Sequence, residues 1–187
     1  MSLEKINVNR SDAELLGILF SYVPKIAESK QLDSLLVLIA DLGRELVLAE
    51  RCSLWLVSSD KKELWTKVAH GCDEIRIPIT AGFVGYSYAN NEPLLIEDAY
   101  NDSRFDSSVD KNSGYRTKAV LTVPFKNSVG EVMGVFQAIN KVGGTQFSKD
   151  DLKFLQLTAV YSAKSLESAM LFQELERTQE EITLILG

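Results

Sequence analysis

The chain has 187 residues, 45% of them hydrophobic and 25% charged, with a formal net charge of −6. This composition is that of a globular chain long enough for one full hydrophobic core, and its acidic balance gives no electrostatic reason to expect a nucleic-acid partner. No apolar run approaches the roughly 20 residues that span a bilayer, and the two isolated cysteines, Cys52 and Cys72, suit a reducing compartment, so we expect a cytoplasmic protein without a membrane span.

The first fifty residues are predicted to be helical. Ser11 and Glu14 form a capping-box pattern ahead of apolar residues at helical spacing, and Pro24 is expected to interrupt this segment or to start another helix. From Gln31 to Val47 the apolar residues form one broad stripe at helical spacing. This second segment is therefore predicted to be an amphipathic helix that covers a hydrophobic surface.

Strand patterns follow the helices. The runs 52–57 and 63–69 are separated by a short polar turn, which predicts a β-hairpin. The run 74–79 alternates polar and apolar residues, and Pro78 places it at a sheet edge or at the end of a strand. The next segment, 81–89, is a glycine-bracketed turn that is expected to lead into a short helix.

A brief strand at 94–96 precedes a long polar segment, 97–117, in which no regular period is visible. Long ordered loops in compact domains are usually lids or binding loops, so we expect this segment to cover a site. Two further strands, at 119–126 and 132–140, are predicted to be joined by a tight turn.

A long helix is predicted to begin after Ser148. Its seam consists of Leu152, Leu155, Ala159, Ala163, Leu166 and Met170. We expect this seam to continue to Ile182 and Ile185, and the heptad-like part beyond Ser168 to pack against a partner helix. The order of elements predicts an α+β fold, with a central antiparallel sheet of about six strands flanked by helices from both ends of the chain.

The reactive residues do not suggest an enzyme. His70 is the single histidine, no serine or cysteine nucleophile is marked beside it, and it does not complete a zinc site with the two cysteines. Gly82 and Gly85 are too sparse for a phosphate loop, and the aspartates of 98–110 lack the spacing of a calcium loop. We therefore predict neither a catalytic site nor a metal site.

Several blocks of the sequence, taken together and in order, resemble a GAF domain. The blocks are Arg51-Cys52-Ser53-Leu54-Trp55-Leu56, Glu74-Ile75-Arg76-Ile77-Pro78, Ile96-Glu97-Asp98-Ala99-Tyr100, Gly114-Tyr115-Arg116-Thr117 and Gly134-Val135-Phe136-Gln137-Ala138-Ile139-Asn140-Lys141. The likeness is greatest to GAF domains of cyclic-nucleotide phosphodiesterases and bacterial adenylate cyclases. It implies an N-terminal helical extension at 1–30, a GAF domain at 31–172 and a C-terminal signalling and dimerisation helix at 173–187.

The cyclic-nucleotide-binding members of this family carry a motif of Asn-Lys, a variable gap, Phe, three residues and then Asp-Glu. Asn140-Lys141, Phe147 and Asp151 match this motif, and Leu152 stands where the family has Glu. The resemblance implies that Lys141 and Asp151 form an ion pair beside the pocket. Such a pair would tie the last strand to the following helix without contacting the ligand.

The resemblance also implies a set of ligand-binding positions. They are Ser53, His70, Phe83, Val84, Asp110, Ser113, Thr117 and Gln137. Ala69 and His70 replace an aromatic-acidic pair of the family, Asp106 replaces a lid aromatic and Gln137 replaces an acidic residue. We therefore expect the aromatic stack on the ligand to be absent, and the base preference stays open. The phosphate is expected to meet a helix N-terminus, at 85–89, or Arg116.

The resemblance implies a regulatory, non-catalytic domain that binds cyclic AMP or cyclic GMP. Ligand would order the 97–117 segment and control a linked effector domain, which is not in this chain, through the terminal helices. The helices of 11–50 and 149–186 are expected to form a homodimer. The alternative is a GAF dimerisation and signalling module with a different ligand or none.

Overall fold

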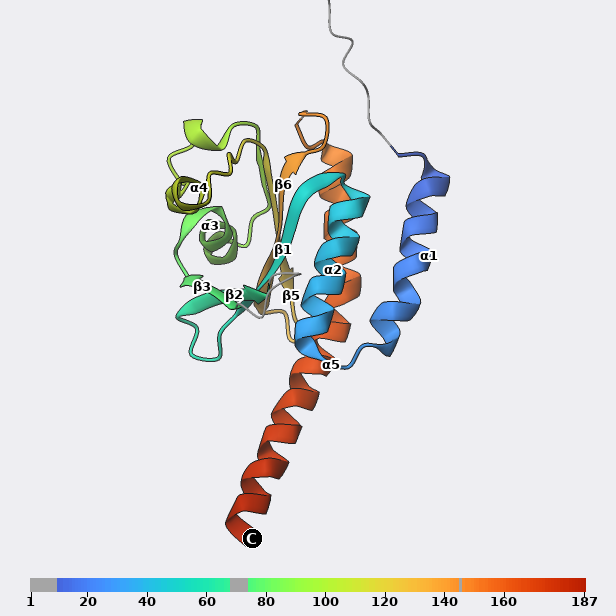
Figure 1. Cartoon of the computed structure of the whole chain (residues 1–187), viewed down its shortest axis with the longest axis vertical. Helices are drawn as coiled ribbons and strands as arrows, with labels where there is room; N and C mark the ends of the chain where they lie inside the picture. The colour runs from blue at the N-terminus through green and yellow to red at the C-terminus, as the bar shows by residue number, and fades with distance from the viewer. Residues whose placement is uncertain (1–9, 68–73, 145) are drawn as a thin grey trace, which may run out of the picture.

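A six-stranded antiparallel sheet separates two layers of helices in this computed structural model, which describes residues 10–67, 74–144 and 146–187 (Figure 1). The strands are β1 (Ala49–Val57), β2 (Glu63–Lys67), β3 (Glu74–Pro78), β4 (Leu94–Ile96), β5 (Val120–Lys126) and β6 (Val132–Lys141). They lie in the order β3-β2-β1-β6-β5-β4, and every neighbouring pair is antiparallel. The predicted α+β fold is confirmed, and Pro78 belongs to an edge strand.

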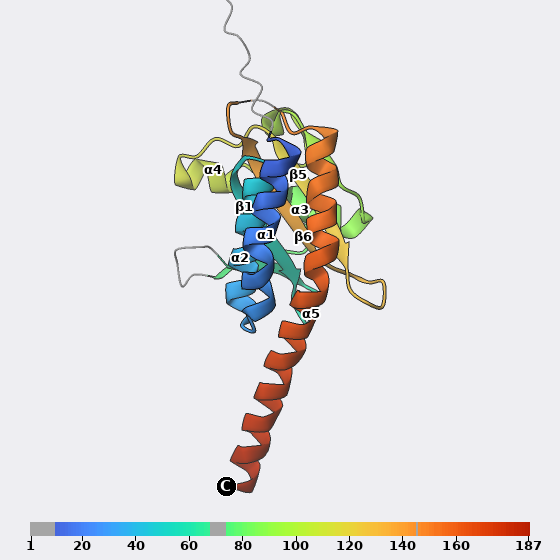
Figure 2. The same ribbon diagram turned by 90° about the vertical axis from the view of Figure 1, so that its right-hand side faces the viewer.

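Three long helices cover one face of the sheet. They are α1 (Asp12–Glu28), α2 (Leu32–Leu46) and α5 (Lys149–Leu186), whereas α3 (Gly82–Asn90), the 3-10 turn η1 (Ala99–Asn101) and α4 (Ser108–Ser113) belong to the other side. Figure 2 shows α1 lying over α2, with α5 beside them and extending far below the sheet. Helices from both ends of the chain therefore form one layer.

The main hydrophobic core lies between the sheet and the three long helices. Ile39 and Leu42 of α2, Leu54 of β1, Phe136 of β6 and Leu155 of α5 are all fully buried there. The opposite face of the sheet has two smaller clusters, around Trp55 and around Phe83. The two sides of the sheet thus differ in how much apolar surface they bury.

The capping box predicted for α1 is present, since Ser11 Oγ accepts from the Glu14 amide at 3.2 Å and the Glu14 carboxylate accepts from the Ser11 amide at 2.8 Å. The expected break at Pro24 is wrong, because α1 continues through Pro24 to Glu28. Pro24 and Phe20 lie on the exposed side of the helix. Water can therefore reach the carbonyl that proline leaves without a donor.

One further expectation needs correction. The 97–117 segment is not irregular throughout, because η1 and α4 form within it, both too short to show a period in the sequence. The buried positions of α5 end at Ala169, so Ile182 and Ile185 are exposed in the single chain, and the packing of this part of the seam against a partner helix stays a prediction. Beyond that point α5 has left the sheet.

Gly43 of α2 lies against the core, and Gly17 of α1 faces open space. A Cβ at Gly43 would lie 2.6 Å from the ring of Phe136, whereas a Cβ at Gly17 would meet nothing within 4 Å. We predict that Gly43→Ala destabilises the fold by about 1–3 kcal/mol through overpacking. Gly17→Ala should stabilise it by about 0.5–1 kcal/mol, because alanine favours the helix.

Urea unfolding followed by circular dichroism measures both changes. Because both glycines lie in helices, equal effects of the two substitutions would contradict the close packing of α2 on β6.

Candidate functional site

The face of the sheet opposite the long helices carries a row of polar side chains. Ser53 of β1 lies opposite Gln137 of β6, and Gln137 lies opposite Thr122 of β5. Ser53 and Gln137 are half-buried, and Thr122 is fully buried. Trp55, two residues beyond Ser53, packs on Val84 of α3, so this row lies on the face that α3 covers.

Helix α3 approaches this face closely. A Cβ at Gly85 would lie 2.5 Å from the carbonyl carbon of Thr80, so only glycine lets α3 pack this closely against the turn that follows β3. Ser87 Oγ lies 2.8 Å from Thr122 Oγ1, which joins α3 to β5. Phe83 and Val84 are both buried between the helix and the sheet, and their predicted role in ligand binding stays a prediction.

An aromatic stack does close this region, although Asp106 replaces the family's aromatic. Phe105, one residue earlier, stacks on Phe83 with ring centroids 5.7 Å apart, and Tyr100 meets the edge of Phe105 at 5.0 Å. This stack joins two protein side chains, so the expected absence of an aromatic stack on the ligand stays a prediction. Sequence reasoning missed Phe105 because it compared single positions.

Arg104 lies beside this stack. Its guanidinium is 4.6 Å from the Tyr86 ring centroid and 5.9 Å from that of Phe83. It also forms two hydrogen bonds, at 2.6 and 2.9 Å, to the carboxylate of Asp102. These hydrogen bonds hold the pKa of Asp102 at about 2. Arg104 therefore links residues 97–117, called the lid from here on, to α3, and it does so while its charge stays paired with Asp102.

Asp110 and Thr117 contact each other at the base of the lid. The Asp110 carboxylate accepts from the Thr117 amide at 2.7 Å, from Thr117 Oγ1 at 2.8 Å and from the Tyr100 hydroxyl at 2.8 Å. Burial acts to raise the pKa of Asp110, but the hydrogen bonds from Thr117 and Tyr100 outweigh it and lower that pKa. Ser113 is exposed at the end of α4, where its hydroxyl accepts from the Tyr115 amide at 3.3 Å.

Asn140 holds the end of the lid to the sheet. It adopts a positive φ of 58°, a conformation that asparagine tolerates better than most residues. Its side-chain oxygen accepts from the amides of Lys118 at 2.7 Å and Ala119 at 3.1 Å, and its nitrogen donates to the Arg116 carbonyl at 2.8 Å and to the Tyr115 hydroxyl at 2.9 Å. One side chain thus holds four of the five residues 115–119.

Tyr115 completes this anchor. Its hydroxyl donates to Glu50 at 2.6 Å, and burial together with this bond raises the pKa of Tyr115 to about 12. The guanidinium of Arg51 lies 3.6 Å from its ring centroid. Arg116, a candidate for the phosphate, is exposed and stacks 4.4 Å from the Tyr100 ring centroid.

Lys141 and Asp151 lie in contact between β6 and α5. Lys141 Nζ is 2.9 and 3.0 Å from the two Asp151 oxygens, and each residue is 6% exposed. Asp151 also accepts from the Ser148 amide at 2.8 Å, and Ser148 Oγ accepts from the Asp151 amide at 3.0 Å, which caps α5. Phe147 packs in the main core. The ion pair therefore fixes where α5 starts.

His70 lies outside the described residues. Trp55 Nε1 is buried without a hydrogen-bond partner on the face that carries Ser53 and Gln137, and no sequence pattern marks such a donor. Within the described ranges no cluster of histidine, cysteine, aspartate and glutamate is arranged to hold a metal ion. None of the helices described there has the length and apolarity to cross a membrane.

A family model described as GAF domain matches residues 31–166. A Takifugu rubripes protein described as dual 3′,5′-cyclic-AMP and -GMP phosphodiesterase 11A is 38% identical over 138 residues, and the match covers 66% of this chain and 15% of that protein. The chain therefore spans a small part of this relative.

Two solved structures resemble the fold. The GAF domain of a phosphoenolpyruvate-protein phosphotransferase from Coxiella burnetii has a TM-score of 0.74 and 19% identity, over 88% of this chain and 99% of that one. The free methionine-R-sulfoxide reductase of Neisseria meningitidis, solved with its substrate, has a TM-score of 0.69 and 20% identity, over 87% and 95%. The same fold thus occurs in regulatory domains and in an enzyme.

The Asp110 carboxylate generates a pH-dependent prediction. Because its folded-state pKa is lowered, its contribution to stability is complete above the unfolded pKa of about 3.9 and is lost as pH falls through the folded value. We expect Asp110→Asn to lower the melting temperature at pH 7 and to lower it less at pH 3. Thr117→Val, which removes one donor, should show part of the same change. A melting difference that stays constant from pH 7 to pH 3 would contradict this role.

The buried ion pair generates a second prediction. Lys141→Met leaves Asp151 buried without its cation, and we expect a loss of about 3–5 kcal/mol in the free energy of unfolding. Arg177→Met is the matched control, because it breaks an exposed pair with Glu181 whose loss should cost less than about 0.5 kcal/mol. Urea unfolding compares the two variants. Similar small losses would show that Lys141 does not stabilise the junction.

Proposed function

The chain belongs to the GAF domain family, and from that membership we propose that it is a regulatory sensor domain that binds cyclic AMP or cyclic GMP and controls a linked signalling effector. The GAF domain is a regulatory domain, and the relative from Takifugu rubripes is a phosphodiesterase of both nucleotides. The catalytic activity of that whole protein is not carried over, because the chain spans 15% of it. A cytoplasmic location is part of the proposal, and Cys52, a free thiol whose pKa is raised by burial, suits it.

One observation carries the ligand proposal: two half-buried polar side chains, Ser53 and Gln137, lie next to the buried Thr122 on the sheet face whose apolar clusters include Phe83 and Val84. A purine needs an apolar slot with a few placed donors and acceptors. The proposed contacts are Ser53, His70, Phe83, Val84, Asp110, Ser113, Thr117 and Gln137. The first turn of α3 has no side-chain cap, so its free amides suit the phosphate.

The lid takes a specific part in this proposal. The Thr117 amide and hydroxyl donate to the Asp110 carboxylate in the described structure, so these two residues fix the base of the lid without ligand. Phe105 covers Phe83 above the polar row. We expect ligand to displace or join this stack, which would change how residues 97–117 lie on the sheet.

The terminal helices are proposed to form a homodimer and to pass the signal on, as an N-terminal extension at 1–30 and a signalling helix at 173–187 around the domain of 31–172. Three large apolar residues of α1 are exposed, Leu16, Phe20 and Val23. On α5 the exposed apolar residues beside the sheet are Leu157, Val160 and Tyr161. Large apolar patches on one surface usually mark an interface.

A thermal-melt comparison tests the function. Cyclic AMP or cyclic GMP at about 100 times its dissociation constant should stabilise the domain by about 2.7 kcal/mol, which raises the melting temperature by roughly 5–10 °C. Gln137→Leu should reduce that rise, because it removes a polar contact at the proposed site. Gln156→Leu, the same change at an exposed position of α5, should leave the rise intact.

The outcomes separate the candidate functions. A rise with one nucleotide only would establish the sensor and choose the base. No rise with either nucleotide, for a folded and ligand-free sample, would favour a GAF dimerisation and signalling module with a different ligand or none. Turnover of either nucleotide by the purified chain would contradict the assignment as a non-catalytic domain.

A further inference from the structure

One buried donor on the α3 side of the sheet has no hydrogen-bond partner among the described residues. Trp55 of β1 is 8% exposed, and its indole Nε1 is both shielded from water and unpaired. Leaving a buried donor unpaired costs stability, because the group has lost its hydrogen bond to water and gained none in return. In a binding domain such a group marks a place where a ligand can supply the missing acceptor.

Two other buried polar atoms of the described residues lack a partner, and neither points to a ligand. Arg10 Nε stands next to residues outside the described range. Ser162 Oγ lies on α5, where a hydroxyl can turn toward a carbonyl of the preceding helical turn. The indole N–H has no such alternative, because it is fixed in the plane of its ring.

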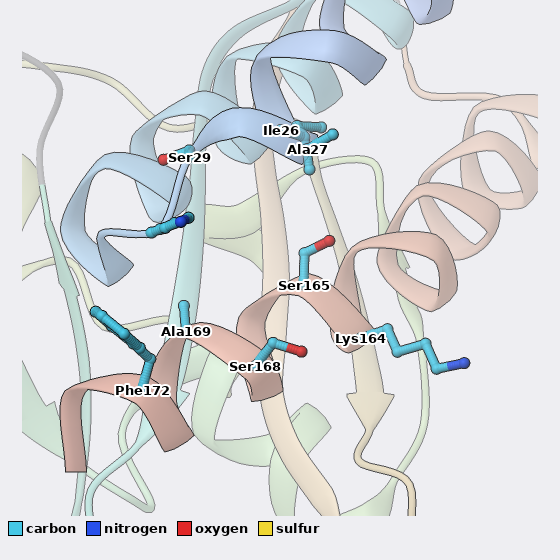
Figure 3. Close-up of a pocket in the computed structure, with 9 residues that line it drawn as sticks. Ile26, Ala27, Ser29, Lys164, Ser165, Ser168, Ala169 and Phe172 are labelled. Atoms are coloured by element: carbon cyan, nitrogen blue, oxygen red, sulfur yellow. The ribbon is translucent and has the colours of Figure 1, made fainter. Parts of the chain in front are cut away.

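A groove between the end of α1 and α5 offers a contrast. It encloses about 480 Å³. Figure 3 shows Ser165 and Ala169 directed toward the end of α1, whereas Lys164 points away from it. None of the described residues that line this groove holds a buried polar atom without a partner. The unpaired indole therefore directs attention to the α3 side of the sheet.

Trp55 lies against the start of α3. It packs with Val84, which is 3% exposed. The amides of residues 82–84 precede the first backbone hydrogen bond of α3, which runs from the Gly85 amide to the Ala81 carbonyl at 2.9 Å. No side chain caps this end of the helix. A buried indole donor and a set of uncapped backbone donors therefore belong to residues in contact.

We propose that Trp55 is a further ligand-binding residue, whose indole Nε1 donates a hydrogen bond to a phosphate oxygen of the ligand beside the amides of the first turn of α3. This inference rests on the proposed function. It adds a donor that the likeness to the family does not mark and that only the burial and the missing partner of Nε1 reveal.

The chemistry of these groups selects an anion. An indole N–H and a backbone amide only donate, and the positive end of the α3 dipole lies at the same place. The described side chains in the cluster around Trp55 are uncharged; they are Val57, Leu64, Ile77, Ile79, Val84, Tyr88 and Val135. A purine base offers donors as well as acceptors, so it suits Ser53 and Gln137, which have both.

The indole lies close enough to this polar row to share one ligand with it. Ser53 and Trp55 are two residues apart on β1, so they face the same side of the sheet about 7 Å apart. Water does not reach Nε1 in the described structure, so a phosphate can contact it only after the start of α3 moves or the indole turns. Ligand bound in this way changes how α3 lies on β1.

The indole signals in the nuclear magnetic resonance spectrum of the isotope-labelled, full 187-residue chain test the contact directly. The chain has two tryptophans. Trp65 of β2 packs on the main core and is the matched control. Trp55→Phe and Trp65→Phe assign the two signals. Saturating cyclic AMP or cyclic GMP should move the Trp55 Hε1 signal downfield, because this proton gains a charged acceptor, and should leave the Trp65 signal nearly unchanged.

Affinities measure how much the donor contributes. Trp55→Phe keeps an aromatic ring and removes the N–H, so it should raise the Kd of the bound nucleotide about tenfold or more, as the loss of a hydrogen bond to a charged group does. Trp65→Phe, the same change on the other face of the sheet, should leave that Kd nearly unchanged. Circular dichroism melts confirm that both variants are folded.

Phosphorothioates separate a hydrogen bond from a packing effect. In the Rp and Sp phosphorothioates of the same nucleotide, sulfur, a weaker acceptor, replaces one or the other phosphate oxygen. If Nε1 donates to one of these oxygens, the effect of Trp55→Phe should shrink at least about threefold for one diastereomer and persist for the other. A purely structural role of Trp55 would weaken both diastereomers and the parent nucleotide equally.

The failures are distinguishable. If a nucleotide raises the melting temperature and the Trp55 Hε1 signal does not move, the donor role of Trp55 is overturned and the sensor proposal stands. Equal effects of Trp55→Phe on the nucleotide and on both phosphorothioates would overturn that role as well. If neither nucleotide raises the melting temperature or moves either indole signal, the cyclic-nucleotide proposal itself fails, and this inference fails with it.

Discussion

The junction at Asn140 and Lys141 holds both the 97–117 lid and helix α5 to the end of β6. Lys141 and Asp151 are both nearly excluded from water. Because an unpaired charge is costly in a buried position, this ion pair keeps the end of β6 and the start of α5 together. Asn140, the preceding residue, turns the chain through a positive φ and holds residues 115–119. Two consecutive residues thus fix the lid on one side and helix α5 on the other.

The two faces of the sheet differ in how much apolar surface they bury and in how many polar groups they enclose. The long-helix side holds the large core, in which Phe136 packs against Gly43 and Leu155. The α3 side has smaller apolar clusters and keeps polar groups inside, such as Ser87 on Thr122. Elements with fewer buried apolar contacts open at lower free energy. We therefore expect a response to ligand to occur on the α3 side, whereas the long-helix side stays folded.

The spacing of apolar residues predicted the long helices and the strands correctly. The stripe from Gln31 to Val47 and the edge position of Pro78 follow from residue spacing, and both are observed. Helix α4 was not predicted because a segment of six residues is too short to show a helical period. The predicted break at Pro24 was wrong because the position is exposed, so water can replace the backbone hydrogen bond that proline removes. The site was harder to predict, because the contact between Phe105 and Phe83 depends on how residues 97–117 fold over the sheet. Residue types name candidate contacts, whereas tertiary packing decides which of them meet.

A ligand changes an equilibrium only through the difference between its affinities for the two states. The Asp110 carboxylate already has three donors, so closing the lid base adds little to that difference. The Phe83–Phe105 stack, the polar row of Ser53 and Gln137 and the unpaired Trp55 indole are the groups whose contacts a ligand would change. Their strands, β1 and β6, are direct neighbours, and β6 leads through Asn140 and Lys141 to α5. Contacts made on this row therefore have a short structural route to α5, the helix that we propose passes the signal on.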